Sequence, residues 1–374
     1  MQITFVSNYI NHHQIPVSDE LFKLANGSYT FIQTEPMEKE RIKMGWDVNS
    51  FNKPYVKLFY DDEESSKKLI MDSDCVIFGG TEREELIEPR LLANKLTIRY
   101  SERIYKESRL KFVSPRGLKK KYHDHVRFNK SNVYLLCAGA YVKGDFDLIH
   151  AYPHKKLKFG YFPEFVRYTD LNENRKDNKE LSILWAARFI GLKHPEMMIR
   201  LAKCLKNDGI KAHITMIGNG ELLESTKRLA KDSDVNDYIT FEGSKTPSEV
   251  REYMRAADIF ISTSDRLEGW GAVVNEAMNS GCVTIAARDI GAAPYLIKNG
   301  ENGFMYKAKS DKKLYGIVKR LAGDEALRNR IGIKAYETIE TLWNPEVAAG
   351  RLYDFITSEP KDLDKYKDGP LSRA

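Results

Sequence analysis

Short runs of apolar and β-branched residues recur along the first part of the chain, and each is followed by a stretch with helical periodicity. These runs occupy residues 3–8, 29–34, 55–60, 74–79, 96–100, 133–138 and 157–162. Strands that alternate with helices are typical of a parallel, doubly wound sheet. The pattern predicts a Rossmann-like α/β domain over residues 1–168.

A polar stretch at residues 169–180 (TDLNENRKDNKE) interrupts this alternation and has no apolar periodicity, which predicts a linker. The alternation then restarts. The second set of predicted strands lies at residues 181–187, 212–217, 238–242, 258–263 and 282–287. A second Rossmann-like domain is therefore expected over residues 181–344.

Three helical segments are predicted to close the chain. The last begins at Pro345, where proline suits the first helical position, and is expected to span residues 345–359. Residues 360–374 are rich in charged residues and poor in large apolar ones, so we predict a polar tail there.

Composition fits an ordinary globular protein of two domains, because the chain has 374 residues, of which 42% are hydrophobic and 30% are charged. The longest apolar run, residues 133–142, is shorter than the roughly 17 to 25 residues of a membrane-spanning helix. The first residues lack the basic and apolar regions of a signal peptide. A cytosolic protein is expected.

The four cysteines are far apart and form no CxxC pair or zinc-binding spacing, so we expect reduced core residues. They are Cys75, Cys137, Cys204 and Cys282.

One loop of the second domain combines features of a nucleotide-sugar site. Ligands of open α/β sheets bind at the carboxyl ends of the strands, and the segment DRLEGWGAVVNEAM follows the strand predicted at residues 258–263. Gly269 and Gly271 allow a ligand to approach the backbone, and a helix that begins near Gly271 offers N–H groups to a phosphate. Glu268 and Glu276 are eight residues apart, about 12 Å along a helix, which suits two hydroxyl-bearing rings on either side of a diphosphate.

The segment EGWGAVVNE resembles the Glu-x7-Glu hallmark of the family 4 (retaining, group 1) glycosyltransferases, and the resemblance covers about residues 181–306. It implies the GT-B fold, in which two Rossmann-like domains face a cleft. It also implies that Glu268 contacts the transferred sugar and Glu276 the ribose, with Trp270 and Ala272 in the donor-binding loop. Retention of anomeric configuration is implied as well.

Arg188 and Lys193 follow the strand predicted at residues 181–187 and reach the same sheet edge. An arginine fork and a lysine point charge can stabilise a leaving diphosphate, although exposed charge at a helix start is the alternative. Similar family members carry an Arg and a Lys at this interval, so the resemblance makes both catalytic candidates. No metal and no other cofactor is then expected. Gly218 and Gly220 resemble the family's G-x-G loop near the nucleotide base.

The first domain should supply the acceptor pocket, but it departs from the family pattern. Where relatives often have Gly-Gly after the first strand, this chain has His12 and His13, which can donate to a phosphate or to the acceptor. Solvated loop histidines without a role are the alternative. Arg99 and Glu102 lie at the end of the fifth strand and are further candidates. A structural ion pair is the alternative for these two.

The strongest charge asymmetry lies between residues 109 and 130, where the only acid is Asp124. The eight basic residues are Arg109, Lys111, Arg116, Lys119, Lys120, Lys121, Arg127 and Lys130. Phe112 and Phe128 are interleaved, and Leu118, Tyr122 and Val126 repeat at helical spacing, as in a helix that lies on an anionic membrane. Lys119, Lys120 and Lys121 are the predicted membrane patch. An ordinary basic helix with one buried stripe is the alternative.

Two other kinds of enzyme and one kind of binding protein are the alternatives to this interpretation. Asp145 and Asp147 form an Asp-x-Asp pair, the metal site of the other common glycosyltransferase fold, but they open a helix instead of ending a strand. A sugar-nucleotide epimerase of similar fold is a second alternative. A nucleic-acid or anionic-surface binder would explain the basic tract but leave Glu268 and Glu276 without a role.

The sequence thus predicts transfer of a sugar from a nucleotide-sugar donor to a glycan or lipid-linked acceptor, in the synthesis of cell-surface polysaccharide or glycoconjugate. The basic tract predicts attachment to the inner face of the cell membrane, and no nucleic acid partner is expected.

Overall fold

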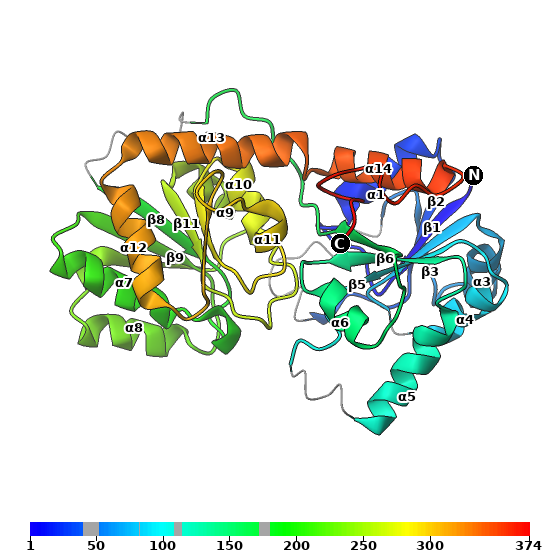
Figure 1. Cartoon of the computed structure of the whole chain (residues 1–374). Coiled ribbons are helices and arrows are strands. Elements are labelled where there is room, and N and C mark those ends of the chain that lie inside the picture. The colour runs from blue at the N-terminus through cyan, green and yellow to red at the C-terminus, as the bar shows by residue number, and fades with distance from the viewer. Residues whose placement is uncertain (40–51, 82, 108–113, 172–179) are drawn as a thin grey trace. The chain divides into compact units, whose positions relative to one another are not determined.

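The computed structural model describes residues 1–39, 52–81, 83–107, 114–171 and 180–374. The chain divides into two compact units (Figure 1). Unit 1 comprises residues 1–164 and 342–374, and unit 2 comprises residues 165–341. Most of the predicted linker, residues 172–179, lies outside the described residues.

Unit 1 is built on a sheet of seven parallel strands in the order β3-β2-β1-β4-β5-β6-β7. The strands are β1 (Ile3–Ser7), β2 (Tyr29–Gln33), β3 (Val56–Leu58), β4 (Cys75–Gly79), β5 (Thr97–Ser101), β6 (Val133–Ala138) and β7 (Lys156–Phe159). All seven overlap the predicted runs, although β3 is short and β7 ends three residues before the predicted run does. The central strands β1 and β4 are buried along their whole length, as expected for a sheet covered on both faces.

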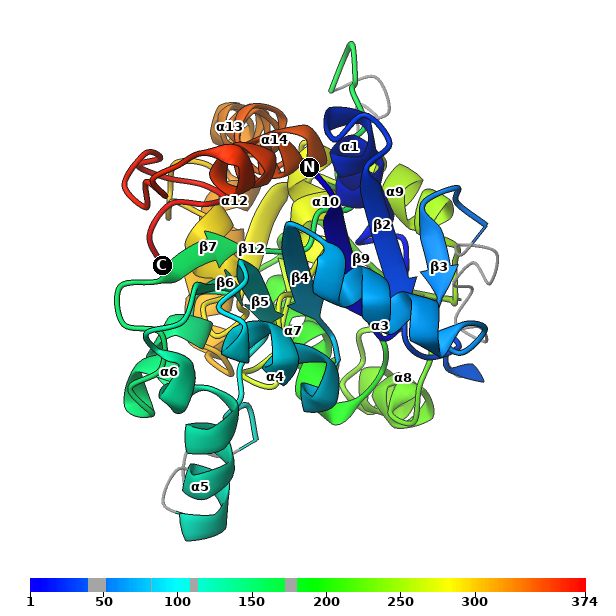
Figure 2. The ribbon, with the colours of Figure 1, turned by 90° about the vertical axis from the view of Figure 1, so that its right-hand side faces the viewer.

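The helices of unit 1 connect these strands and cover the sheet. They are α1 (Ile15–Leu24), α3 (Glu63–Asp72), α4 (Glu84–Leu92), α5 (Pro115–Asp124), α6 (Val142–Leu148) and α14 (Pro345–Thr357). A proline at the start of α5 and of α14 presets the helical backbone. The side chains of Ser114 and Asn344 cap these helices, because each accepts a hydrogen bond from the backbone N–H of the residue three positions later. The predicted last helix is therefore present, but it packs against α1 of unit 1 (Figure 2).

The residues after α14 differ from the predicted polar tail. Leu371 is buried, its N–H donates to the carbonyl of Lys158 at 2.8 Å, and the N–H of Ala374 donates to the carbonyl of Lys156 at 3.1 Å. Arg373 forms an antiparallel bridge with Leu157. The physical reason is that β7 is an edge strand whose unpaired backbone groups accept a further segment.

Unit 2 contains a second parallel sheet, of six strands, in the order β10-β9-β8-β11-β12-β13. The strands are β8 (Leu181–Ala186), β9 (Ala212–Ile217), β10 (Ile239–Gly243), β11 (Ile259–Ser262), β12 (Val283–Ala287) and β13 (Phe304–Tyr306). Five match the prediction. The sixth, β13, has only three residues at the sheet edge and was not predicted.

The helices of unit 2 are amphipathic or nearly fully buried. They are α7 (Glu196–Asn207), α8 (Leu223–Asp232), α9 (Pro247–Ala256), α10 (Val273–Asn279), α11 (Ala293–Leu296), α12 (Asp311–Ala322) and α13 (Glu325–Thr341). A capping box of Thr246 and Glu249 fixes the start of α9. The fold class predicted from the sequence, two Rossmann-like doubly wound parallel sheets followed by C-terminal helices, is confirmed.

Candidate active site

The strand order of unit 2 defines where its functional loops lie. The chain starts at β8, proceeds through β9 and β10 on one side, and then returns to β11 on the other side of β8. In doubly wound sheets, ligands bind at the carboxyl edge of such a reversal. The loop after β8 carries Arg188 and Lys193, and the loop after β11 carries Glu268. Three predicted site residues thus lie at the topological switch point.

Two of these side chains are in direct contact. Lys193 ends a short 3₁₀ turn, η4 (Gly191–Lys193), and its Nζ forms an ion pair with the Glu268 carboxylate. Their side chains are 13% and 18% exposed, so the pair is largely shielded but still open to a ligand. The N–H of Asp265 donates to the carbonyl of Leu192 at 3.0 Å and ties the two loops together.

A buried network that the sequence did not reveal holds Lys193 in place. The indole N–H of Trp185 donates to the Thr263 hydroxyl at 2.8 Å, and this hydroxyl donates to the carbonyl of Lys193. Trp185 and Thr263 are each 1% exposed. Thr263 directly follows β11, and this position at a strand end was the only sequence signal for it.

His194 and Asp265 form a second missed pair beside this network. The backbone of His194 is left-handed, with φ of 47°, and its Nε2 lies 2.9 Å from Oδ2 of Asp265. Lys309 is 3.6 Å from the same carboxylate. Both residues belong to loops that the sequence had singled out, but neither fits a catalytic motif. The pair restrains the loop that carries Lys193.

Arg188 is exposed, and its guanidinium forms no hydrogen bond or ion pair with any residue that the structure describes. The turn that contains Gly218 and Gly220 packs against the backbone of Ala187 and Phe189, the residues on either side of Arg188. A Cβ at Gly218 would lie 1.9 Å from the carbonyl oxygen of Ala187, and one at Gly220 would lie 2.5 Å from that of Phe189. These glycines therefore fix the loop that presents Arg188, a structural role that the G-x-G resemblance did not indicate.

Glu276 lies in the first turn of α10, and part of its side chain remains accessible. The carboxyl group is surrounded by protein, and this desolvation raises its pKa to about 7 although Arg251 favours the charged form. A carboxylate so poorly hydrated gains from hydroxyl donors. The geometry suits a group that receives hydrogen bonds from a ligand.

The loop before α10 is shaped by glycine. Gly271 has φ of 84°, and a Cβ there would lie 2.7 Å from Cγ2 of Ile290. Gly269 is buried and Ala272 immediately precedes α10. The ring of Trp270 is 1% exposed and its Nε1 donates to Asn275 at 2.8 Å, so only the backbone of this predicted donor-binding residue can meet a ligand.

Three of the four acceptor candidates of unit 1 lie around Tyr161. The ring of His13 is parallel to that of Tyr161, with centroids 6.2 Å apart, and the His12 and His13 rings are 3.9 Å apart. The Tyr161 hydroxyl donates to Glu102 at 2.6 Å. Burial lowers the pKa of His12 to about 4, so this imidazole is neutral and can accept or donate a hydrogen bond without carrying charge.

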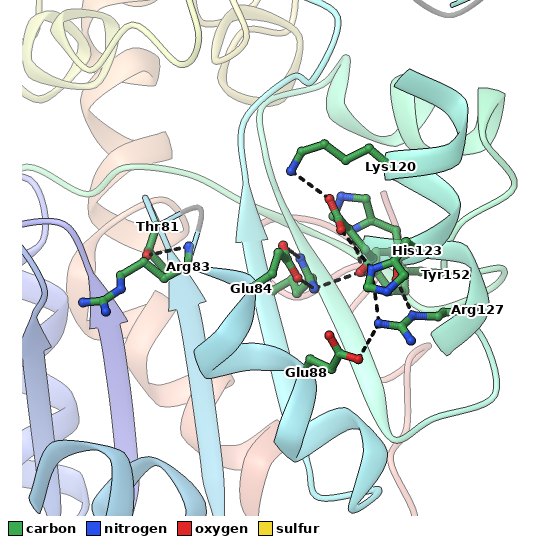
Figure 3. A network of polar contacts seen from close by, with 11 residues as sticks. Thr81, Arg83, Glu84, Glu88, Lys120, His123, Arg127 and Tyr152 are labelled. Atoms are coloured by element: carbon green, nitrogen blue, oxygen red, sulfur yellow. Dashed lines mark hydrogen bonds and ion pairs between the residues drawn. The ribbon is translucent and has the colours of Figure 1, made fainter. Parts of the chain in front are cut away.

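Arg99 points elsewhere. Its guanidinium binds the Glu84 carboxylate through two hydrogen bonds of 2.9 and 2.6 Å and also donates to the carbonyl of Asp124 at 2.9 Å. The side chain is only 7% exposed, so Arg99 belongs to a structural ion pair, but its partner is Glu84 (Figure 3), whereas Glu102 pairs with Lys106.

The basic tract forms α5 and the turn after it, whereas Arg109, Lys111 and Phe112 lie outside the described residues. Lys119 and Lys120 are exposed, Lys121 is partly exposed, and the apolar side chains of Leu118 and Tyr122 are 37% and 60% exposed. The predicted stripe is shorter than expected, because α5 ends at Asp124 and Val126 packs on the core. Phe128 is buried.

The Asp-x-Asp pair has a structural role. Asp145 is buried in α6, where it accepts from Arg103 at 3.2 and 3.3 Å and from the N–H of Tyr105 at 3.0 Å. Asp147 pairs with Lys143 and Lys156. Among the residues that the structure describes, no three His, Cys, Asp or Glu side chains gather as a metal site would require.

Comparison with known proteins finds a family match in unit 2. Residues 166–338 match the model of the family "Glycosyl transferases group 1". The chain is 22% identical over 203 residues to a GDP-mannose-dependent alpha-(1-6)-phosphatidylinositol monomannoside mannosyltransferase of Mycobacterium tuberculosis. This match covers 53% of this chain and 52% of that protein. It is 27% identical over 217 residues to the amylovoran biosynthesis glycosyltransferase AmsK of Erwinia amylovora, covering 54% and 53% of the two chains.

The chain spans about half the length of these curated relatives. A solved structure covers more: HepE of Anabaena, determined in complex with UDP, aligns over 95% of this chain and 99% of its own with a TM-score of 0.72 and 12% identity. At this identity the likeness concerns the fold. The match to the group 1 glycosyl transferases thus covers residues 166–338, and the two sheets of the chain have the GT-B fold.

Proposed function

We propose that the chain is a glycosyltransferase that moves a sugar from a nucleotide-sugar donor to a glycan or lipid-linked acceptor, with the donor bound in unit 2. One observation carries the proposal. The loops after the neighbouring strands β8 and β11 meet at the switch point of the sheet, and they carry Arg188, Lys193 and Glu268. The family match over the same residues supports it.

In the proposed reaction, Arg188 and Lys193 hold the donor diphosphate and stabilise its charge as the glycosidic bond breaks. Arg188 is available for this because no described residue occupies its guanidinium. Lys193 would exchange part of its contact with Glu268 for the diphosphate. Glu268 then accepts from hydroxyls of the transferred sugar, and Glu276 accepts from the ribose hydroxyls.

The acceptor would bind on unit 1, where His12, His13 and Glu102 gather around Tyr161. We further propose that the sugar is transferred with retention, the donor phosphate taking the proton of the incoming hydroxyl on the same face. Relatives named for phosphatidylinositol mannoside and amylovoran synthesis favour a role in glycolipid or polysaccharide synthesis.

A panel of UDP-, GDP- and ADP-sugars tests the proposal through shifts in melting temperature and release of free nucleotide. At least one donor should raise the melting temperature and be turned over, and proton NMR of the transferred sugar should show the anomeric configuration of the donor. A panel in which no nucleotide sugar binds would contradict the proposal, and an inverted product would contradict retention alone.

The exposed face of α5 supports a second proposal, that unit 1 attaches to an anionic membrane to reach a lipid-linked acceptor. Lys119 and Lys120 are exposed between the exposed Leu118 and Tyr122, on a helix that extends away from its sheet (Figure 2). In the part of the chain that the structure describes, no helix is long and apolar enough to cross a bilayer.

A further inference from the structure

His194 lies between two acidic side chains, in the loop that follows β8. Its Nε2 is 2.9 Å from Oδ2 of Asp265, and its Nδ1 is 3.2 Å from Oε1 of Glu196. The side chains of His194 and Asp265 are each 14% exposed, so the contact between them is largely shielded from water. Both ring nitrogens of this histidine therefore face carboxylate oxygens.

This arrangement is fully satisfied only when the ring carries two protons. An ionised carboxylate accepts hydrogen bonds and donates none, whereas a neutral imidazole has one N–H donor and one acceptor nitrogen. The neutral ring can thus donate to one of the two acids, and its other nitrogen then faces another acceptor. The imidazolium ion donates to both acids, and each bond is stronger because both of its partners are charged.

The carboxylate of Asp265 stays ionised. Burial favours its neutral form, but the hydrogen bonds that it accepts from His194 and from the backbone N–H of Leu267 outweigh this effect and lower its pKa. The bond from Leu267 to Oδ1 measures 3.0 Å, and the Lys309 ammonium lies 3.6 Å from Oδ2. The side chain of Asp265 is therefore held in a fixed position opposite the ring.

Further charged groups lie beside the second acid. The Arg200 guanidinium is 3.8 Å from the Glu196 oxygen that faces His194, but its Nε is bound to Asp311 at 2.7 Å. Of the side-chain types around the ring, histidine is the one whose charge ordinarily changes between about pH 5 and 8. A change of pH in this range acts on this cluster through His194.

The loops that His194 and Asp265 join also carry the ion pair of the proposed donor site. Lys193 directly precedes His194, and the backbone N–H of Glu268 donates to the carbonyl of Asp265 at 3.0 Å. Lys193 and Glu268 are paired with each other through their side chains. The contact between His194 and Asp265 thus helps to fix how these two side chains are placed.

We propose that His194 is a positioning residue, which in its protonated form holds Lys193 and Glu268 in place and so makes donor binding weaken as the pH rises. The inference rests on the proposed function and adds regulation by pH to it. When the ring loses a proton, it can keep its bond to Asp265 but must release Glu196, which is 35% exposed and can turn toward water. The loop then loses its attachment to the first turn of α7.

Calorimetry with the nucleotide sugar that binds in the panel of UDP-, GDP- and ADP-sugars tests the proposal, at about pH 5.5 and about pH 8. His194→Asn removes the charge, and asparagine tolerates the left-handed backbone of this position. The dissociation constant of this variant divided by that of the wild type should fall by about fivefold from the lower to the higher pH, because only the wild type loses a charge-assisted bond. The ratio removes the contribution of Glu276, which changes its charge in both proteins.

Two further variants complete the experiment. Asp265→Asn should lose the pH dependence, because an asparagine whose Oδ1 still accepts from Leu267 turns its Nδ2 donor toward the ring and favours the neutral imidazole. His213→Asn is the matched control: His213 lies on β9 of the same unit with its Nε2 2.8 Å from the Thr240 hydroxyl, and its replacement should leave the dependence as in the wild type.

A ratio for folded His194→Asn that is the same at both pH values would overturn the proposal, and so would an equal effect of His213→Asn. Full pH dependence in Asp265→Asn would also overturn it, since the imidazolium would then act on the donor by its charge and not by positioning the loops. Melting curves show which variants are folded.

The proposed function fails separately, if no nucleotide sugar of the panel binds the wild-type protein. The backbone amides of Leu267 and Glu268 then test His194 without a donor, because both donate to Asp265. Their signals in ¹H–¹⁵N NMR spectra should move over the same pH range in the wild-type protein and stay in place in His194→Asn. Signals that behave alike in the two proteins would overturn the inference.

Discussion

At the scale of single residues, the most informative group is the Glu276 carboxyl. Desolvation raises its pKa from the ordinary value of 4.5 to about 7, so the folded protein holds a proton there that the unfolded chain releases at lower pH. The folded state therefore binds more protons between these two values. Its stability must fall as the pH rises from 4.5 to 7 and stay level above that.

Replacing this acid should remove the part of the pH dependence of the unfolding free energy that it causes. We expect Glu276→Gln to match the wild-type protein in unfolding free energy near pH 4.5 and to exceed it increasingly up to pH 7, by at most about 3 kcal/mol. Urea unfolding at several pH values measures this. A difference that is constant across the range would mean that Glu276 keeps an ordinary pKa.

The two basic residues of the proposed donor site give a second prediction. Arg188 and Lys193 can neutralise the leaving diphosphate, so transfer should proceed without a divalent cation. Activity with the donor identified from the panel should be unchanged after treatment with EDTA. Loss of activity that magnesium or manganese restores would contradict this, and would require a metal site that Asp145 cannot supply while Arg103 and Tyr105 occupy it.

At the scale of elements, the turn after β9 determines how the loop after β8 presents Arg188. Gly218 has φ of 134°, and its Cα faces the carbonyl of Ala187 so closely that no side chain fits. We expect Gly218→Ala to destabilise the protein by at least 2 kcal/mol, an estimate that combines backbone strain of about 1 to 3 kcal/mol with the displaced carbonyl. It should also weaken donor binding, because the shifted backbone adjoins Arg188.

Gly316 offers the matched control. It lies on the exposed side of α12 with nothing within 4 Å of an added Cβ, and its backbone is helical. Gly316→Ala should stabilise the protein by about 0.5 to 1 kcal/mol. Thermal unfolding of both variants compares them, and similar melting temperatures would show that the turn tolerates a side chain.

The elements also show what the sequence could predict. Strand positions could be predicted because buried parallel strands are continuous apolar runs in the sequence. The loops after β8 and β11 were proposed as the site because Arg, Lys, Glu and Gly follow these strands in the sequence, and that proposal stays a prediction. The short edge strand β13 and the pairing of Leu371 with β7 depend on tertiary contacts. So do the partners of Arg99 and the buried ring of Trp270, which no local pattern specifies.

At the scale of the whole molecule, charge distribution matters more than the net charge of +6. The lysines of α5 stand beside exposed apolar side chains, and each basic residue near an anionic surface contributes about 1 kcal/mol. Lys119→Glu, Lys120→Glu and Lys121→Glu combined should release the protein from vesicles containing phosphatidylglycerol, and salt should do the same to the wild-type protein.

Co-sedimentation with such vesicles measures the attachment, and nucleotide-sugar binding in unit 2 serves as the internal control because α5 belongs to unit 1. If the wild-type protein stays in the supernatant at low salt, the face of α5 is only solvated and a soluble acceptor becomes the better proposal.

The central claim, that unit 2 binds and activates a nucleotide sugar through Arg188, is tested most directly by the kinetics of donor turnover in Arg188→Ala beside Arg330→Ala, an exposed arginine of α13 in the same unit. The account predicts that Arg188→Ala lowers kcat/KM at least tenfold, because it removes a charge-assisted contact of about 1.5 to 3 kcal/mol, and that Arg330→Ala has no effect. Wild-type kinetics in Arg188→Ala, with the fold intact, would contradict it.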